Sequence, residues 1–261
     1  MMRIFKYDLY RMLWNKFFVG LGIITVLYSY QLMAGEIVLG IANTAPYSGW
    51  SYGMFLAKML PVLLLSLLFF ISFLYSEKEE KVREIINSAP IDPRRLGLLR
   101  CGAMIIGFLC ITLISIIVSM CFYATYFKFA DLSQLFLPIL ITILPAMLFI
   151  LGLGIAAGRI HRSLLYALMF LILLFSLIPV PYALDLFGTT IYQAIPPTLS
   201  LGADGEPAFV IPASVWIGKV VYSLIGIILI ILGLTRHSTT QLSLTVSEQK
   251  DKDSEKQAGN F

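Results

Sequence analysis

Residues 55–95 read FLAKMLPVLLLSLLFFISFLYSEKEEKVREIINSAPIDPRR. Residues 55–75 are apolar apart from Lys58, whereas residues 76–95 are dense with glutamate, lysine and arginine. An α-helix needs roughly 20 apolar residues to cross the hydrocarbon core of a bilayer. The stretch therefore predicts a membrane-spanning helix that is followed at once by a charged segment outside the lipid.

The composition of the whole chain favours the same class. The 261 residues are 59% hydrophobic and 13% charged, and the mean hydropathy is +0.87. A soluble domain is less apolar and carries about a quarter charged residues. The net charge of +4 is explained by basic loops on one side of a membrane, and no basic stripe with interleaved aromatic residues indicates nucleic-acid binding.

Apolar runs predict an all-α membrane protein with six transmembrane helices, since open backbone groups cannot be satisfied in lipid. The expected spans lie near 17–35, 55–75, 101–125, 135–157, 163–180 and 212–234. The start of the chain is charged throughout and lacks a small-residue cleavage site, so we expect the first apolar run to remain as a helix.

Basic residues gather on one side of these spans, which places both termini in the cytoplasm by the positive-inside rule. The basic residues on that side are Arg3, Lys6, Arg11, Lys16, Lys78, Lys81, Arg83, Arg94, Arg95, Arg100, Arg159, Arg162, Arg236, Lys250, Lys252 and Lys256. The other side has Lys58, Lys128 and Lys219, and we expect Lys58 and Lys219 to extend to the outer interface.

Three parts of the chain are distinguished. Residues 1–16 predict an amphipathic interfacial helix, with Phe5, Leu9, Met12 and Leu13 on one face. Residues 17–235 form the transmembrane domain, with an outer loop at 181–211 that is either an ordinary loop or an element dipping into the outer leaflet. Residues 236–261 have the composition of a disordered cytosolic tail.

The cytosolic loop 76–100 is too long for a simple connection between helices. Val82, Ile85 and Ile86 have helical spacing, and Pro90 ends that helix. Asp92 and Pro93 then predict the capped start of the next helix. These features are typical of a compact knob that inserts into a soluble partner, and a solvated loop that only obeys the positive-inside rule is the alternative.

Small residues end the fourth apolar run, as Gly152-Leu153-Gly154-Ile155-Ala156-Ala157-Gly158. The pairs Gly152 with Ala156 and Gly154 with Gly158 have the spacing at which membrane helices pack closely. A phosphate-binding loop does not fit, because no Lys-Ser/Thr follows and the setting is apolar.

Catalytic chemistry is not indicated. We find no metal-ligand spacing, no nucleophile with a base and no nucleotide-binding motif, so we expect this chain to be no enzyme, to bind no cofactor and to hydrolyse no ATP itself. No charged residue stands near the middle of a span, where most ion-coupled carriers have one, which disfavours a secondary transporter. If the chain moves a substrate uphill, the energy must come from a partner.

With these features the chain resembles the ABC-2 family of ATP-binding-cassette permeases. The resemblance rests on the amphipathic start, the six spans with both ends inside, and the segment from Glu77 to Pro90 between spans two and three. The family's Glu-x-Gly-Thr stretch lacks its glycine here, because Val82-Arg83-Glu84 stands near that place.

The resemblance implies a permease subunit of an ATP-driven exporter, multi-pass in a bacterial plasma membrane. It implies docking of a separate nucleotide-binding subunit on residues 77–95, a second permease subunit, identical or related, and re-entrant outer elements before the last span. The docking residues that it implies are Glu80, Arg83, Glu84, Ile85, Ile86 and Pro90. A membrane anchor, sensor or immunity-type subunit that transports nothing is the alternative function.

Overall fold

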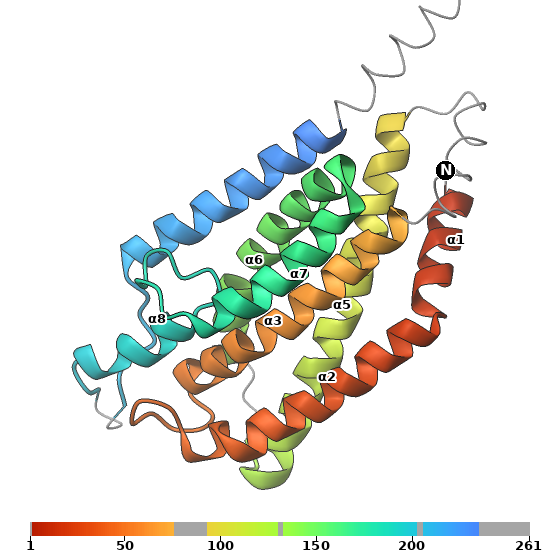
Figure 1. Ribbon diagram of the computed structural model, residues 1–261. Helices are drawn as coiled ribbons and strands as arrows, with labels where there is room; N and C mark the ends of the chain where they lie inside the picture. The colour runs from red at the N-terminus through yellow and green to blue at the C-terminus, as the bar shows by residue number, and fades with distance from the viewer. Residues whose placement is uncertain (1, 76–92, 130–132, 203–205, 235–261) are drawn as a thin grey trace, which may run out of the picture.

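The computed structural model describes residues 2–75, 93–129, 133–202 and 206–234. The regular secondary structure of these residues is helical, apart from one isolated antiparallel pairing of Leu201 with Pro207. The helices lie side by side as a bundle (Figure 1). Their bounds are α1 Met2–Leu13, α2 Lys16–Gly35, α3 Gly49–Leu74, α5 Pro93–Tyr126, α6 Ser133–Ile160, α7 Arg162–Leu177, α8 Thr189–Ala194 and a last helix, Ala213–Leu234, with the 3₁₀ turns Ile37–Leu39 and Pro196–Thr198.

Five of these helices are long and apolar enough to cross a membrane: Lys16–Leu39, Gly49–Leu74, Arg95–Tyr126, Leu135–Ile160 and Ala213–Leu234. Helix α7, expected to span over 163–180, has 16 residues and a length of about 24 Å. It ends at Leu177 because Pro179 and Pro181 follow, and Ile178 takes an extended conformation before the first proline. The structure thus gives a multi-pass bundle, and the count of six spans stays a prediction.

Two helices begin earlier than the apolar runs indicate. Helix α3 begins at Gly49 instead of residue 55, because the Ser48 hydroxyl accepts a hydrogen bond from the Ser51 N–H and caps the first turn. Helix α5 begins at Pro93, the position expected for the capped restart, and continues without interruption into the third apolar run.

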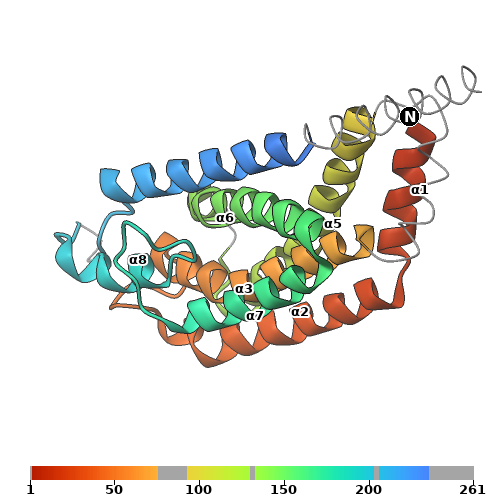
Figure 2. The same ribbon diagram turned by 45° about the horizontal axis from the view of Figure 1, so that its top comes forward.

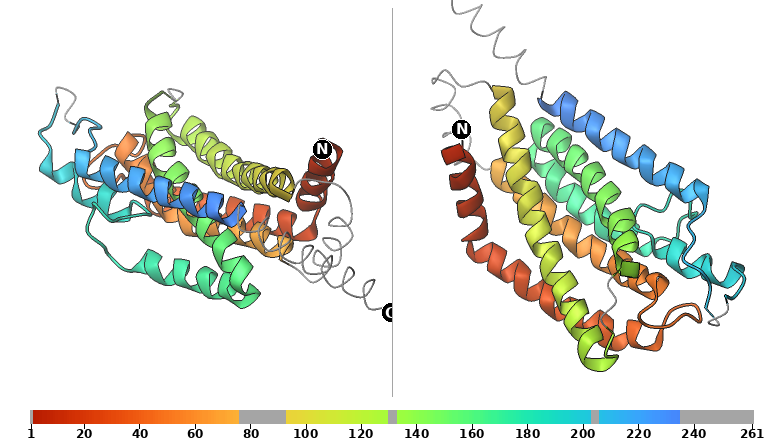
Figure 3. Two further views of the ribbon diagram at one scale, coloured as in Figure 1. Left: turned by 90° about the horizontal axis from the view of Figure 1, so that it is seen from above. Right: turned by 180° about the vertical axis from the view of Figure 1, so that it is seen from behind.

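The helices alternate in direction between two ends of the bundle (Figures 1 and 3). We call them the α1 end, where α3 finishes and α5 begins, and the α8 end, which carries α8 and the turns around it. The last helix returns to the α1 end, where Leu234 contacts Gly97 at the start of α5. The described chain therefore begins and ends at the same end of the bundle.

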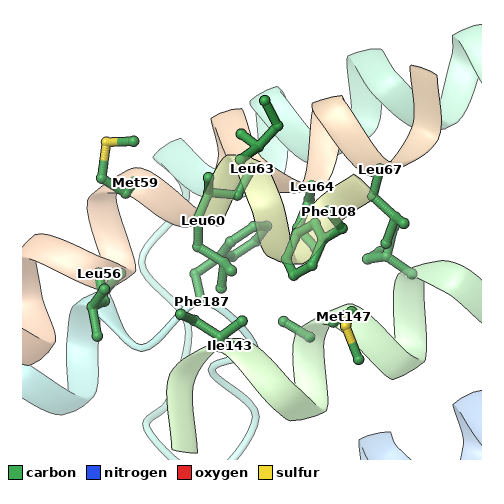
Figure 4. Close-up of a cluster of buried hydrophobic side chains, with 14 of the residues drawn as sticks. Leu56, Met59, Leu60, Leu63, Leu64, Leu67, Phe108, Ile143, Met147 and Phe187 are labelled. Carbon is green, nitrogen blue, oxygen red and sulfur yellow. The ribbon is translucent and has the colours of Figure 1, made fainter. Parts of the chain in front are cut away.

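Helix α3 is the centre of the bundle and contacts α2, α5, α6, α7 and α8. Its leucines, with Phe108 of α5 and Ile143 and Met147 of α6, form the middle of the apolar core (Figure 4). In contrast, the last helix lies along an edge of the bundle (Figure 3, right). In α3, 78% of the most apolar 18-residue stretch is buried inside the bundle. The corresponding share in the last helix is 11%.

Candidate functional site at the α1 end

The α1 end is the candidate site, because the two helices that flank the charged segment meet there. The residues that the resemblance implies for docking, namely Glu80, Arg83, Glu84, Ile85, Ile86 and Pro90, lie outside the described residues. What the structure describes is how each side of that segment is attached. Helix α3 leads into it and α5 leads out of it.

The end of α3 is attached to α6. The Tyr75 hydroxyl donates to the Ile155 carbonyl at 3.2 Å, and the Tyr75 ring lies directly over Gly158, where a Cβ would collide with it. One turn earlier on α6, Gly154 lies against Leu68 and Ile71 of α3. Gly154 and Gly158 thus let α3 and α6 approach closely at the α1 end.

Gly152 lies on a different face of α6 and meets the last helix. A Cβ on Gly152 would lie 2.5 Å from the carbonyl oxygen of Gly226, and a Cβ on Gly226 would meet the Leu148 carbonyl. The two backbones are therefore in direct contact. Nearer the α1 end, the Arg159 guanidinium donates to the carbonyl of Gly233 on the last helix.

The start of α5 is attached to α1. Arg100 Nε lies 3.9 Å from Asp8 Oδ2, and both side chains are largely buried. Two glycines of α5 also contact α1: Gly102 lies against the Phe5 ring and Gly107 against Met12. The amphipathic face expected for the first residues therefore packs partly on protein, and α1 turns away from the line of α2 (Figure 2).

The α8 end is held by a buried polar cluster that sequence reasoning did not find. The Asp185 carboxylate accepts from the backbone N–H groups of Gly188 and Thr190 at 2.7 Å each, and so caps α8. Lys219 of the last helix is 4% exposed, and its Nζ donates to the Leu186 carbonyl at 2.8 Å. The expectation that Lys219 extends to the interface is wrong, because residues 181–188 fold over it.

Two aromatic residues hold the outer loop onto the bundle. The Tyr192 hydroxyl pairs with Thr142 Oγ1 of α6 at 2.7 Å, and the Trp50 indole of α3 donates to the Pro207 carbonyl. Burial raises the pKa of the Tyr192 phenol further above its usual range. The described residues of the outer loop 181–211 thus pack on α3, α6 and the last helix. The sequence left open whether this loop lies on the bundle or dips into the outer leaflet, because it contains no local pattern that identifies a packing partner.

A seam of hydroxyl groups lies between α2 and α5. Ser29 Oγ and Ser115 Oγ are 2.9 Å apart, and both side chains are fully buried. Thr25, one turn before Ser29, and Thr112, one turn before Ser115, have buried hydroxyls with no hydrogen-bond partner. The helical spacing of these residues is visible in the sequence. It predicts a polar contact between helices only when α2 and α5 are known to pack together.

No group of His, Cys, Asp and Glu that could hold a metal ion exists among the described residues. A scan against protein-family models gave no match, and comparisons with curated proteins and with solved structures gave none either. The site must therefore be interpreted from its own geometry. That geometry is a pair of helix ends, each attached to the bundle, on either side of a charged segment.

Proposed function

We propose that this chain is the permease subunit of an ATP-driven exporter in a bacterial plasma membrane. A separate nucleotide-binding subunit docks on residues 77–95 from the cytoplasm and supplies the energy. The observation that carries the proposal is the attachment of this charged segment to α3, the most buried helix of the bundle. A partner that pulls on the segment acts directly on the core.

The mechanism follows from close packing. Helix α3 contacts five other helices, and a packed core transmits a displacement instead of absorbing it. At the α1 end, Tyr75 couples α3 to α6, and Arg159 couples α6 to the last helix. A movement of the docking segment is thus passed across the bundle as rigid-body motion of helices.

The distribution of basic side chains supports a cytoplasmic position for the α1 end. Basic residues near that end include Lys6, Arg11, Lys16, Arg95, Arg100, Arg159 and Arg162. At the α8 end stand Lys58, Lys128 and Lys219, of which Lys58 pairs with Glu36 and Lys219 is buried. This arrangement supports the proposal that the α1 end, where α3 finishes and α5 begins, faces the cytoplasm.

A second permease subunit is part of the proposal. The last helix exposes a continuous apolar surface that includes Ile217, Leu224 and Ile228, which are 53–65% exposed. Such an apolar surface is stable against lipid, and it is equally stable against the matching helix of another subunit. The substrate path would then lie between the two copies.

Co-purification from native membranes tests the docking. Residues 77–90 are replaced with a neutral flexible linker of equal length, and the matched control replaces residues 240–253 in the same way. We expect the intact chain and the control to bring down a nucleotide-hydrolysing subunit, and the linker variant to insert normally but to lose it. Retention of that subunit by the linker variant, with an unchanged ATPase response, would contradict the proposal.

The identity of the captured protein separates the two functions considered for this chain. A soluble ATPase supports the permease. A kinase or a peptidase supports an anchor or sensor subunit that transports nothing. Two double variants test which side chains hold the partner. Ile85→Ser with Ile86→Ser weakens apolar contacts, whereas Glu80→Gln with Glu84→Gln weakens charge pairing.

A further inference from the structure

Three helices of the bundle have many exposed large apolar side chains: α2, α7 and the last helix. Only 22% of the most apolar stretch of α2 is buried, and 11% of that of the last helix. These two helices lie on opposite sides of the bundle (Figure 2). In a membrane, exposed apolar surface of this kind faces the lipid chains. The length of each exposed band therefore indicates the thickness of hydrocarbon that the protein fits.

On α2 the exposed band has a polar side chain at each end. Every exposed side chain from Phe17 to Tyr30 is apolar or aromatic, whereas Lys16 and Gln31 are exposed and polar. Beyond Gln31 the exposed residues of the helix are the small pair at 34–35. An α-helix rises 1.5 Å per residue, so Lys16 and Gln31 are about 22 Å apart along the axis.

The band on α7 ends where the helix ends. It begins after Arg162, which is exposed, and the last helical residue, Leu177, is 80% exposed. Ile178 then takes an extended conformation, and the exposed Pro179 follows. Exposed backbone outside a helix cannot satisfy its polar groups in hydrocarbon. The hydrocarbon therefore ends near Ile178, which is about 24 Å from Arg162 along the axis.

The last helix has a band of similar length. Trp216, near the α8 end, is 40% exposed, and a Trp at the end of a membrane helix lies at the interface. At the α1 end, the Arg159 guanidinium donates to the carbonyl of Gly233, which places a charged group at that level. A guanidinium is stable in the headgroup layer and costly in hydrocarbon. Trp216 and Gly233 are about 25 Å apart along the axis.

All three bands are shorter than an average bilayer is thick. The hydrocarbon core of a typical bilayer measures about 30 Å, whereas the bands measure about 22–25 Å. Tilting a helix lowers the height that its band covers, so tilt increases the difference. The longer helix α3 does not remove it, because most of that helix is covered by other helices. A second copy on the last helix would leave the bands of α2 and α7 unchanged.

We propose that the protein fits a bilayer of short acyl chains, and that it thins a bilayer of average thickness around α2 and α7. The partner of this surface is the hydrocarbon of the surrounding phospholipids. Thinning costs free energy for each ångström of mismatch, so the stability of the protein depends on acyl-chain length. This property does not depend on the exporter proposal.

Thermal unfolding of the full chain in lipid nanodiscs tests the proposal. The nanodiscs contain phosphatidylcholine with monounsaturated chains of about 14, 18 or 22 carbons, so the headgroup stays constant while the hydrocarbon thickness changes. We expect the highest unfolding temperature with the shortest chains, and a fall of several degrees from the shortest to the longest. A maximum with the middle or the longest chains would overturn the proposal.

A pair of variants separates band length from a general effect of the lipid. Gln31→Leu with Ala34→Leu lengthens the band of α2 by about one turn, since both positions are exposed and continue the face of Ile24 and Leu27. We expect its unfolding temperature to fall less from the shortest to the longest chains. The matched control, Ile23→Leu with Ile24→Leu, keeps the band length and should behave as the intact chain. Equal falls for all three proteins would overturn the proposal, and circular dichroism verifies that each is folded.

Discussion

Helix α3 and the last helix have the same hydropathy but opposite positions in the molecule. The most apolar stretch of each has a mean hydropathy of 2.4, yet 78% of it is buried in α3 and 11% in the last helix. Hydropathy measures compatibility with lipid, and a lipid-facing helix is as apolar as a helix inside a bundle. Whether a helix lies in the core or at the edge is decided by small residues and by polar contacts at particular sites. We therefore expect the two helices to differ in the substitutions that they tolerate.

The largest effect is expected where the last helix touches the bundle. In Gly226→Leu the new side chain meets the backbone of Leu148 and Phe149, so the two helices must separate. We expect a loss of about 3 kcal/mol, at the upper end of overpacking costs. Reversible unfolding in mixed detergent measures it.

Gly20→Leu is the control for this prediction, because no atom lies within 4 Å of a Cβ at Gly20. Its effect should be small. If both variants lose equal stability, the close contact between α6 and the last helix is not what holds that helix.

Leu64→Ala and Leu224→Ala compare the contribution of leucine packing to stability in α3 and in the last helix. Leu64 of α3 is fully buried, and Leu224 of the last helix is 53% exposed. A cavity in α3 should cost about 2 kcal/mol, because lipid removes much of the transfer contribution but not the lost packing. Leu224→Ala should cost less than about 0.5 kcal/mol. Similar losses for the two variants would mean that Leu224 is covered, which would favour a permanent second subunit on this face.

Hydrogen bonds at the α8 end also distinguish a contact on the core from one on the last helix. Tyr192→Phe leaves the buried Thr142 hydroxyl without its partner, and a loss of about 1 kcal/mol is expected. Tyr222→Phe removes a bond to the Leu184 carbonyl at a more exposed place on the last helix, so a smaller loss is expected. Thermal unfolding in lipid nanodiscs compares them, and a larger loss for Tyr222→Phe would contradict the inferred hold of α8 on the core.

The smallest predicted effect has the opposite sign. Thr25→Val keeps the shape of the side chain and removes a buried hydroxyl that has no partner. A gain of up to about 1 kcal/mol is expected. Ser29→Ala is the contrasting variant, since it breaks the pair with Ser115 and should destabilise. Destabilisation by Thr25→Val would show that its hydroxyl is used.

The sequence predicted the helical class, the amphipathic start and the restart of a helix at Pro93, because each has a local cause. It did not predict the early start of α3 at Gly49, because the expected span followed the apolar run and not the local cap that Ser48 provides. Nor did it predict the burial of Lys219, because that depends on a loop about 30 residues away in the chain. When helices have equal hydropathy, no local sequence pattern shows which of them will be in contact, so such long-range contacts are not predicted.

The central claim is that α3 carries movement from the charged segment into the bundle. Its most direct test is the ATPase rate of the chain purified with its soluble partner, in a background where Cys101, Cys110 and Cys121 are replaced with serine. Tyr75→Cys with Gly158→Cys allows a short thiol cross-linker to fix α3 to α6. Loss of the Tyr75 contact in this variant should lower the ATPase rate severalfold, and fixing the joint with the cross-linker should restore it until a cleavable linker is cut. Equal rates before and after cross-linking would contradict the claim.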